Sequence, residues 1–383
     1  MIKPITLIWL GFSSRVLVAL FGGSPWHKQA VGDSYYYHWI ASRAVNLGER
    51  GLDVSIVQEE ANSLYALSLS ALYFVSTDLY FIGCLYSIFV WLLSAFILKK
   101  ILELLKVDNK TIYLVFLFYV FLPSSLLNTS APMREAFQLL FINLIIYSAL
   151  KVYLNKSLLH WFYLVISCFL LGQFHKGLYA FGGAILLMLT MSIFLRNRRK
   201  FPIEGYIFGV PLIIFLSTYA LGIFSDQVYD LENGLFFTIT TYQEGTLDPL
   251  NFSRASYEPF TTGIEGLLGL VLFIPTNLFQ YLFEPMPWRI SSILDIILTF
   301  ENILRAFLIF VSVRGILKTD IISRRPLLFI FLAFLILETF WSFGTTNWGT
   351  ASRHHVPGMG LILITGFYFY TKYPMNKRIT KTL

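Results

Sequence analysis

An acidic and aromatic stretch follows directly after the first apolar segment of the chain. Residues 32–38 read GDSYYYH, and Asp33 stands at the start of a run with helical periodicity. A carboxylate can act as a general base toward a hydroxyl group, and a nearby imidazole can carry a proton. Asp33 and His38 are therefore candidate catalytic residues, and Tyr36 is a candidate for substrate binding. The structural alternative is that Asp33 caps an interfacial helix in an aromatic belt.

A second polar stretch, NTSAPMREAFQLL, occupies residues 128–140. Ser130 can cap a helix and Pro132 suits a first turn, so the electropositive start of an inward-running helix is expected beside Arg134. Such a helix start favours anions. Arg134 is therefore a candidate for phosphate binding and Glu135 for substrate binding. Alternatively, the two residues simply pair with other charges at the membrane interface.

The stretch FHKGLYAFGG at residues 174–183 has the same arrangement. His175 and Lys176 precede another helix that we expect to run inward. Lys176 is a candidate phosphate ligand and His175 a candidate substrate ligand. The alternative for Lys176 is that its ammonium group extends to lipid headgroups.

A fourth stretch, TTNWGTASRHHVPG, occupies residues 345–358. Arg353 and His354 are expected before the last inward helix, where a phosphate would meet cations and amide donors. Adjacent histidines also raise the possibility of a zinc site. Neighbouring side chains point in different directions, however, and no third ligand has suitable spacing, so we assign no metal ligand.

Two further segments carry weaker signals. In LFEPMPWRISS, residues 282–292, Trp288 could stack on a sugar ring and Arg289 could contact phosphate, or both could anchor the chain at the interface. The acidic loop 224–262 is by default solvated. It could also hold a divalent cation such as Mg²⁺ or Mn²⁺, so no cofactor is certain.

The composition requires a membrane. Hydrophobic residues make up 56% of the 383 residues and charged residues only 13%, which is too little charge to solvate a water-soluble fold. We predict an all-α, polytopic helix bundle with about ten spans, within a range of nine to twelve. The expected spans are 4–22, 72–98, 111–129, 135–151, 158–174, 177–195, 204–223, 290–312, 326–343 and 355–372. The run 263–283 is interpreted as a re-entrant or surface-lying helix.

The distribution of basic residues predicts the orientation. With the N-terminus in the cytoplasm, most Lys and Arg residues fall in cytoplasmic segments, as the positive-inside rule requires. The net charge of +7 therefore does not indicate nucleic acid. We predict one integral domain, 1–383, in the plasma (cell inner) membrane, with both termini cytoplasmic. Its outer loops are 24–70, which we expect to be helical, and 224–262.

Charged residues inside the expected spans need a partner, because a charge is costly there. Glu301 and Arg305 lie four residues apart and are expected to pair with each other. Arg15 and Glu338 have no local partner. They must find one on another helix or line a polar cavity.

The acidic residue in GDSYYYH, directly after the first span, resembles the hallmark of C-type (GT-C) membrane glycosyltransferases, which use polyprenyl-phosphate-linked donors. The resemblance implies a catalytic role for Asp33. The tail around Arg353 also resembles that of bacterial envelope-polysaccharide membrane proteins. Those proteins include both sugar transferases and polymerases, and the tail does not separate the two.

The expected function is that of a membrane glycosyltransferase acting at the outer face in cell-envelope polysaccharide or glycoconjugate synthesis. Its partners would be a polyprenyl-phosphate-linked sugar donor, a sugar, lipid or polysaccharide acceptor, and membrane lipids. Two alternatives stay open: a repeat-unit polymerase of the O-antigen type and a transporter or flippase for lipid-linked sugars. The concentration of polar residues on one side favours an enzyme, because transporters usually place their sites near the bilayer midplane.

Overall fold

The computed structural model describes residues 3–21, 28–48, 51–60, 63–196, 253–260 and 266–373. The regular structure in these ranges is helical, apart from one isolated β-bridge between Ser256 and Asn347. The helices are α1 (Pro4–Leu20), α2 (Lys28–Asn46), α3 (Val54–Glu60), α4 (Leu64–Val75), α5 (Tyr80–Leu104), α6 (Asn109–Phe121), α7 (Pro123–Asn128), α8 (Glu135–Asn155), α9 (Leu158–Phe174), α10 (Leu178–Arg196), α13 (Gly266–Phe283), η4 (Pro287–Arg289), α14 (Ile293–Lys318), α15 (Ile321–Phe343) and α16 (Trp348–Lys372).

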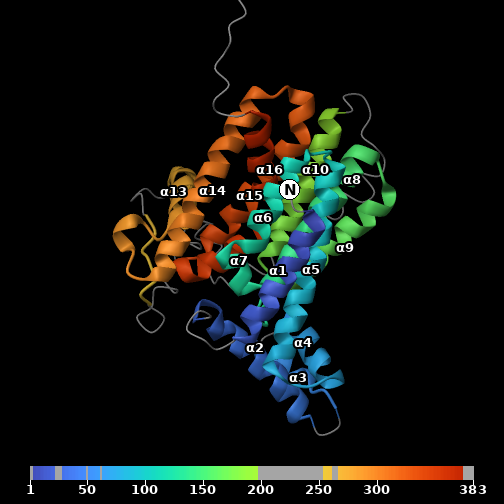
Figure 1. Ribbon diagram of the computed structural model, residues 1–383, viewed down its shortest axis with the longest axis vertical. Helices are drawn as coiled ribbons and strands as arrows, with labels where there is room; N and C mark the ends of the chain where they lie inside the picture. The colour runs from blue at the N-terminus through green and yellow to red at the C-terminus, as the bar shows by residue number, and fades with distance from the viewer. Residues whose placement is uncertain are drawn as a thin grey trace, which may run out of the picture.

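These helices form a bundle with a smaller helical lobe at one end (Figure 1). The lobe consists of α2, α3 and α4, which pack against one another below the bundle. The connection from α14 to α15 lies at the opposite end of the molecule. The prediction that the segment 24–70 is helical is therefore confirmed in its described residues by α2, α3 and the first part of α4.

Five of the described helices are long and apolar enough to cross a membrane: α5, α8, α10, α14 and most of α15. Five shorter apolar helices accompany them. Many large hydrophobic side chains are exposed on these helices, for example Phe162, Phe300 and Leu317. A lipid environment would cover that surface, whereas water would not. The structure thus supports a multi-pass membrane protein, and the number of ten spans stays a prediction.

Two predicted spans differ from the observed helices. The predicted span 72–98 combines the end of α4 with most of α5, because a polar break at residues 76–79 separates the two helices. The predicted span 111–129 is divided between α6 and α7. Pro123 begins α7 and has no amide hydrogen to continue the helix that precedes it. The predicted span 204–223 and most of the acidic loop 224–262 lie outside the described residues.

Helix α16 lies at the centre of the bundle, where it packs against α14, α15, α6 and α8. Small residues allow these close approaches. A Cβ atom on Gly315 of α14 would lie 2.1 Å from the Phe369 ring, and one on Gly366 would lie 2.5 Å from Leu308. Glycine therefore permits α14 and α16 to pack with little space between them.

Arg15 is fully buried in α1, and it finds its partners on other helices as expected. Its Nε donates to Thr129 Oγ1 at 2.7 Å, and its terminal nitrogens donate to the Val120 carbonyl and Ser125 Oγ, both at 3.0 Å. Its guanidinium group also lies 3.6 Å from the centre of the Trp91 ring. Arg15 thereby connects α1 to the segment that leads from α6 through α7 toward α8.

Glu338, Glu301 and Arg305 also have partners on other helices or segments. His355 Nδ1 lies 2.5 Å from Glu338 Oε2, which gives Glu338 the partner that its own helix lacks. Glu301 and Arg305 act on each other electrostatically, as expected, but they form no ion pair with each other. Glu301 instead accepts a hydrogen bond from the Ser124 amide at 2.8 Å, because the start of α7 offers free amide donors, and Arg305 donates to the Leu282 carbonyl.

Replacing Arg15 with alanine should destabilise the bundle substantially. The change removes three interhelical hydrogen bonds from a charged donor, each worth about 1.5–3 kcal/mol, and leaves their buried acceptors without a partner. We expect the melting temperature in detergent to fall by about 5 °C or more. The matched control is Arg43→Ala, because Arg43 forms a half-exposed pair with Glu60. An equal shift in both variants would contradict the role of Arg15.

Candidate functional site

Asp33 lies inside α2, in its second turn, because the helix begins at Lys28. The structural alternative in which Asp33 caps the helix is therefore wrong. Its carboxylate is half-exposed and forms an ion pair with Arg353 NH1 of α16. The two residues are 320 positions apart in the chain. The ion pair joins the helical lobe of α2, α3 and α4 to the central helix of the bundle.

Arg353 reaches Asp33 from within α16 and not from a loop before it. Helix α16 begins at Trp348, where the Asn347 side chain accepts hydrogen bonds from the Gly349 and Thr350 amides. The expectation that Arg353 and His354 precede the last helix is therefore wrong. The helix begins before Arg353 because the side chain of Asn347 can accept hydrogen bonds from the free amides of the first turn. Arg353 is only 12% exposed, so its charge is held in place by surrounding protein.

The start of α8 also differs from the prediction. The helix begins at Glu135 with Arg134 as its N-cap residue, so Ser130 and Pro132 lie in the irregular segment before it. The reason is that Ser130 is engaged with the preceding helix, where its hydroxyl donates to the Leu126 carbonyl. The electropositive beginning of α8 is nevertheless next to Arg134, as the sequence predicts.

Tyr37 marks where these groups meet. It lies four residues after Asp33, on the same face of α2, and burial raises the pKa of its hydroxyl group. Four charged groups act electrostatically on this hydroxyl: Arg134, Glu135, Asp33 and Arg353. Residues from α2, α8 and α16 are thus brought together into one charged cluster, which we call the rim cluster and define by these four charged residues and Tyr37.

The rim cluster contains polar atoms that its own residues do not satisfy. Glu135 is only 3% exposed, and its Oε2 atom has no hydrogen-bond partner. Arg353 Nε is buried and likewise has no partner in the described ranges. Buried polar atoms are normally paired. An unpaired acceptor beside an unpaired donor therefore suggests that water or a ligand completes the cluster.

A stack of three rings adjoins the rim cluster. The His175 ring meets the Trp341 ring edge-on with 4.6 Å between the ring centres, and the His354 ring stacks on Trp341 at 3.9 Å. The charges of Arg134 and Arg353 act on His354, and that of Arg134 acts on His175. Burial lowers the pKa of His175 well below its usual range, and the nearby Arg134 cation lowers it further. His175 is therefore neutral near pH 7, and its Nδ1 atom lacks a partner.

Two predicted residues of α2 lie outside the rim cluster. The His38 Nδ1 atom is 2.9 Å from the Tyr73 hydroxyl, and its ring lies against Tyr80. The Tyr36 hydroxyl donates to the Glu60 carbonyl at 2.7 Å within the helical lobe. Tyr36 and His38 are the chain neighbours of Tyr37, and each is turned by about 100° from it around the helix axis. The structure gives both residues partners within the lobe and its connection to α5.

The remaining predicted residues contact other groups. Lys176 lies between α9 and α10, as predicted, and is exposed. Arg289 lies in η4, with its Nε atom 3.6 Å from the buried Glu284 carboxylate. Trp288 is 76% exposed, which suits an interfacial anchor or an open stacking surface.

Sequence reasoning missed Tyr37 and Trp341. The position of Tyr37 four residues after Asp33 was a usable signal, because such residues share one face of a helix. Trp341 gave no such signal. It stands near the end of an apolar span, and only the packing of α15 against α16 and the turn after α9 shows that it contacts two histidines.

A metal site finds no support in the described part of the chain, which contains no group of three or more His, Cys, Asp or Glu residues able to hold an ion. Six acidic residues belong to the loop 224–262, and of these only Glu258 lies in the described ranges. A divalent cation at that loop stays a prediction.

Comparisons with known proteins place the chain in no family. No protein-family model matches it, and no curated protein matches it significantly. The resemblance to C-type glycosyltransferases therefore depends on the short motifs and on the predicted arrangement of the spans.

The electrostatic contact between Arg134 and His175 can be tested by titration. We expect the histidine signal of His175, assigned through a His175→Gln variant, to titrate well below the usual value of about 6.5. Replacing Arg134 with glutamine should raise this pKa, because it removes a cation that disfavours the protonated ring. Nuclear magnetic resonance of ¹³C-labelled histidine measures the shift. Lys151→Gln, at the other end of α8, is the control, and an identical pKa in both variants would refute the contact.

Proposed function

We propose that the chain is a membrane glycosyltransferase that uses a polyprenyl-phosphate-linked sugar donor at the face that carries the rim cluster. The supporting observation is the ion pair between Asp33 and Arg353, beside Arg134, Glu135 and the beginning of α8. A carboxylate next to fixed cations is what a transfer from a phosphate leaving group to a hydroxyl acceptor needs. With the cationic segments of the chain in the cytoplasm, this face is the outer one.

Binding of the donor would begin with exchange of partners at Arg353. In the structure its guanidinium group holds the Asp33 carboxylate, which has the geometry of two phosphate oxygens. A donor phosphate competes for the same guanidinium donors. The amide groups at the start of α8 and the Arg134 side chain add further positive charge. Phosphate binding would therefore release Asp33 from its partner.

The released carboxylate then has a defined task. Asp33 accepts the proton of the acceptor hydroxyl while the hydroxyl oxygen forms a bond to the anomeric carbon of the sugar. The bond between that carbon and the phosphate oxygen breaks, and its electron pair leaves with the polyprenyl phosphate. The negative charge that grows on this phosphate is stabilised by the two arginines, which are fixed before the reaction starts. Atoms and charge balance without a further reactant.

The neighbouring rings and Glu135 provide a surface for the sugar. The flat face of Trp341 is covered by His354, so the unpaired polar atoms beside it are the groups left to bind hydroxyls. These are Glu135 Oε2, His175 Nδ1 and Trp341 Nε1. Polar atoms in such fixed positions can distinguish sugar epimers, since an unmatched buried polar atom costs about 1–3 kcal/mol.

Removal of the proposed base is the first test. In vesicles that contain a polyprenyl-phosphate sugar and an acceptor, Asp33→Asn should lower transfer by about 100-fold or more, because the amide cannot accept the proton. Released polyprenyl phosphate is the measured product. The matched control is Asp53→Asn, because Asp53 lies in the same lobe, outside the rim cluster, and its carboxylate accepts hydrogen bonds from its neighbours Ser55 and Ile56.

The outcomes separate the alternatives. Loss of transfer in Asp33→Asn, with an unchanged melting temperature, supports the proposal. Transfer at the rate of the unsubstituted protein in Asp33→Asn contradicts it. Movement of the lipid across the bilayer without transfer, unaffected by Asp33→Asn, would instead indicate a flippase.

Replacement of Arg353 tests phosphate binding separately. Arg353→Gln removes charge-assisted hydrogen bonds worth about 1.5–3 kcal/mol, so kcat/KM for the donor should fall about 10- to 100-fold. Most of the change should appear in KM if the arginine already holds the phosphate of the bound donor. Arg43→Gln, in the exposed pair with Glu60, serves as the control. An unchanged KM and kcat in Arg353→Gln would remove Arg353 from the site.

A further inference from the structure

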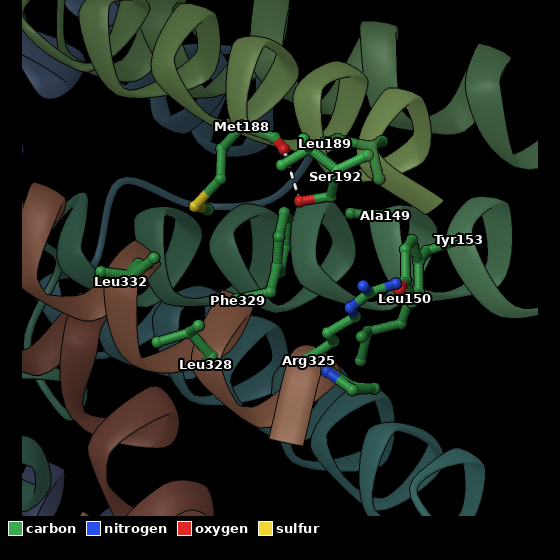
Figure 2. Close-up of a pocket in the computed structure, with 12 residues that line it drawn as sticks. Ala149, Leu150, Tyr153, Met188, Leu189, Ser192, Arg325, Leu328, Phe329 and Leu332 are labelled. Carbon is green, nitrogen blue, oxygen red and sulfur yellow. Dashed lines mark hydrogen bonds between the residues drawn. The ribbon is translucent and has the colours of Figure 1, made fainter. Parts of the chain in front are cut away.

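A cavity lies at the end of the bundle opposite to the rim cluster. It has a volume of about 270 Å³ and is bounded by α8, α10 and α15 (Figure 2). Its lining residue Tyr153 lies 18 positions after Glu135 on α8, which corresponds to about 27 Å along the helix. The cavity is therefore separate from the proposed transferase site, and nothing in the reaction proposed above uses it.

The walls of this cavity are almost entirely apolar. Leu150 comes from α8, Met188 and Leu189 from α10, and Leu328 and Phe329 from α15. Leu332 and Leu195, also in the lining, are 37% and 61% exposed, so the cavity is open toward the lipid-facing surface of the bundle. A hydrocarbon chain could enter it sideways from the bilayer without crossing water.

One end of the cavity is cationic. Figure 2 shows Arg325 and Tyr153 together at one end, and Leu332 and Met188 toward the other. Ser192 cannot supply a free donor, because its hydroxyl donates to the Met188 carbonyl at 2.7 Å. Arg325 forms no ion pair with any residue in the described ranges. The polar group that remains for a ligand is therefore a half-buried guanidinium group.

The cavity changes from cationic to apolar along its length, as a phospholipid changes from its anionic headgroup to its acyl chain. Arg325 is in the second turn of α15, and Leu332 follows seven positions later, about 10 Å deeper along the helix. The cationic end also carries Lys151 and Lys156 near the end of α8. Basic sites of this kind, between membrane helices at the cationic side of a protein, suit anionic headgroups.

We infer that this cavity binds an anionic glycerophospholipid of the surrounding bilayer, with one acyl chain between α10 and α15 and its phosphate on Arg325. The chain fills the apolar part, which would otherwise lose packing contacts on all sides. The phosphate neutralises a cation that forms no ion pair with the described residues. A zwitterionic lipid offers the same chain but adds a positive charge near the arginine, so it binds less well.

The inference predicts a difference between two lipids. Delipidated protein is titrated with phosphatidylglycerol or phosphatidylcholine, and bound lipid is counted by native mass spectrometry. The unsubstituted protein should retain phosphatidylglycerol preferentially. Arg325→Gln should weaken that binding about tenfold, because a charge-assisted contact to phosphate is lost. Arg314→Gln is the matched control, since Arg314 lies near the same end of the bundle, on α14, and does not line the cavity.

A second variant tests the position of the acyl chain. Leu332→Trp fills the apolar end and should displace phosphatidylglycerol while Arg325 is intact. The melting temperature of each variant without lipid shows whether it is folded. Because Leu332 is partly exposed, the larger ring has room to be accommodated.

Several results would overturn the inference. One is equal retention of the two lipids by the unsubstituted protein. Another is an equal loss in Arg325→Gln and Arg314→Gln, which would mean general attraction of the basic surface. Unchanged binding in folded Leu332→Trp would place the lipid elsewhere. Displacement of phosphatidylglycerol by a lower concentration of polyprenyl phosphate would assign the cavity to the donor lipid. Transferase activity is not part of this test, so its result is independent of the proposed function.

Discussion

The pairing of Asp33 with Arg353 is the interaction on which the candidate site depends. It joins the helical lobe, formed by α2 to α4, to the central helix of the bundle. A hydrophobic cluster that includes Tyr37, Tyr65 and Phe137 packs the lobe against the bundle, and the ion pair holds the carboxylate of α2 among the cations of α8 and α16. Because Arg353 is largely buried and Asp33 is half-exposed, the arginine is the fixed partner and the carboxylate the exchangeable one. That asymmetry is what allows an anionic ligand to replace the carboxylate.

The need to pair charges within an apolar bundle explains much of the remaining architecture. Arg15 donates to the Thr129 hydroxyl directly after α7, and Glu338 contacts His355. Glu301 accepts a hydrogen bond from an amide at the start of α7. Each contact joins two different helices of the bundle. An isolated charge in such surroundings would cost more than the bundle can offset. The same contacts fix the irregular segment that carries Arg134 to the rim cluster.

The two ends of the bundle differ in chemistry. The end that meets the lobe gathers carboxylates, arginines and histidines on rigid helices, with several buried polar atoms still unpaired. The opposite end contains an apolar cavity with one arginine at its edge. The first arrangement suits a polar, anionic substrate, and the second suits a structural lipid. A protein that acts on one lipid while it is held by others needs two such sites to be separate.

The sequence alone determined the membrane character, the helical class and the stretches that carry the site. These properties depend on composition and on local patterns, which are present in every short segment of the chain. Arg134, Glu135, His175, Arg353 and His354 were all identified in this way, and the structure brings them together with Asp33. Local patterns were also enough to place Lys176 between two helices.

Only the tertiary structure decided which residues meet. Asp33 is paired with a residue 320 positions away, and Tyr37, not Tyr36 or His38, faces the charges. The hydrogen bond from the Ser124 amide to Glu301 follows from packing as well. The physical reason is that a charge is satisfied by whichever group the folded bundle places within reach. Hydrophobic periodicity defines the face that each helix buries, but not the helix against which that face packs.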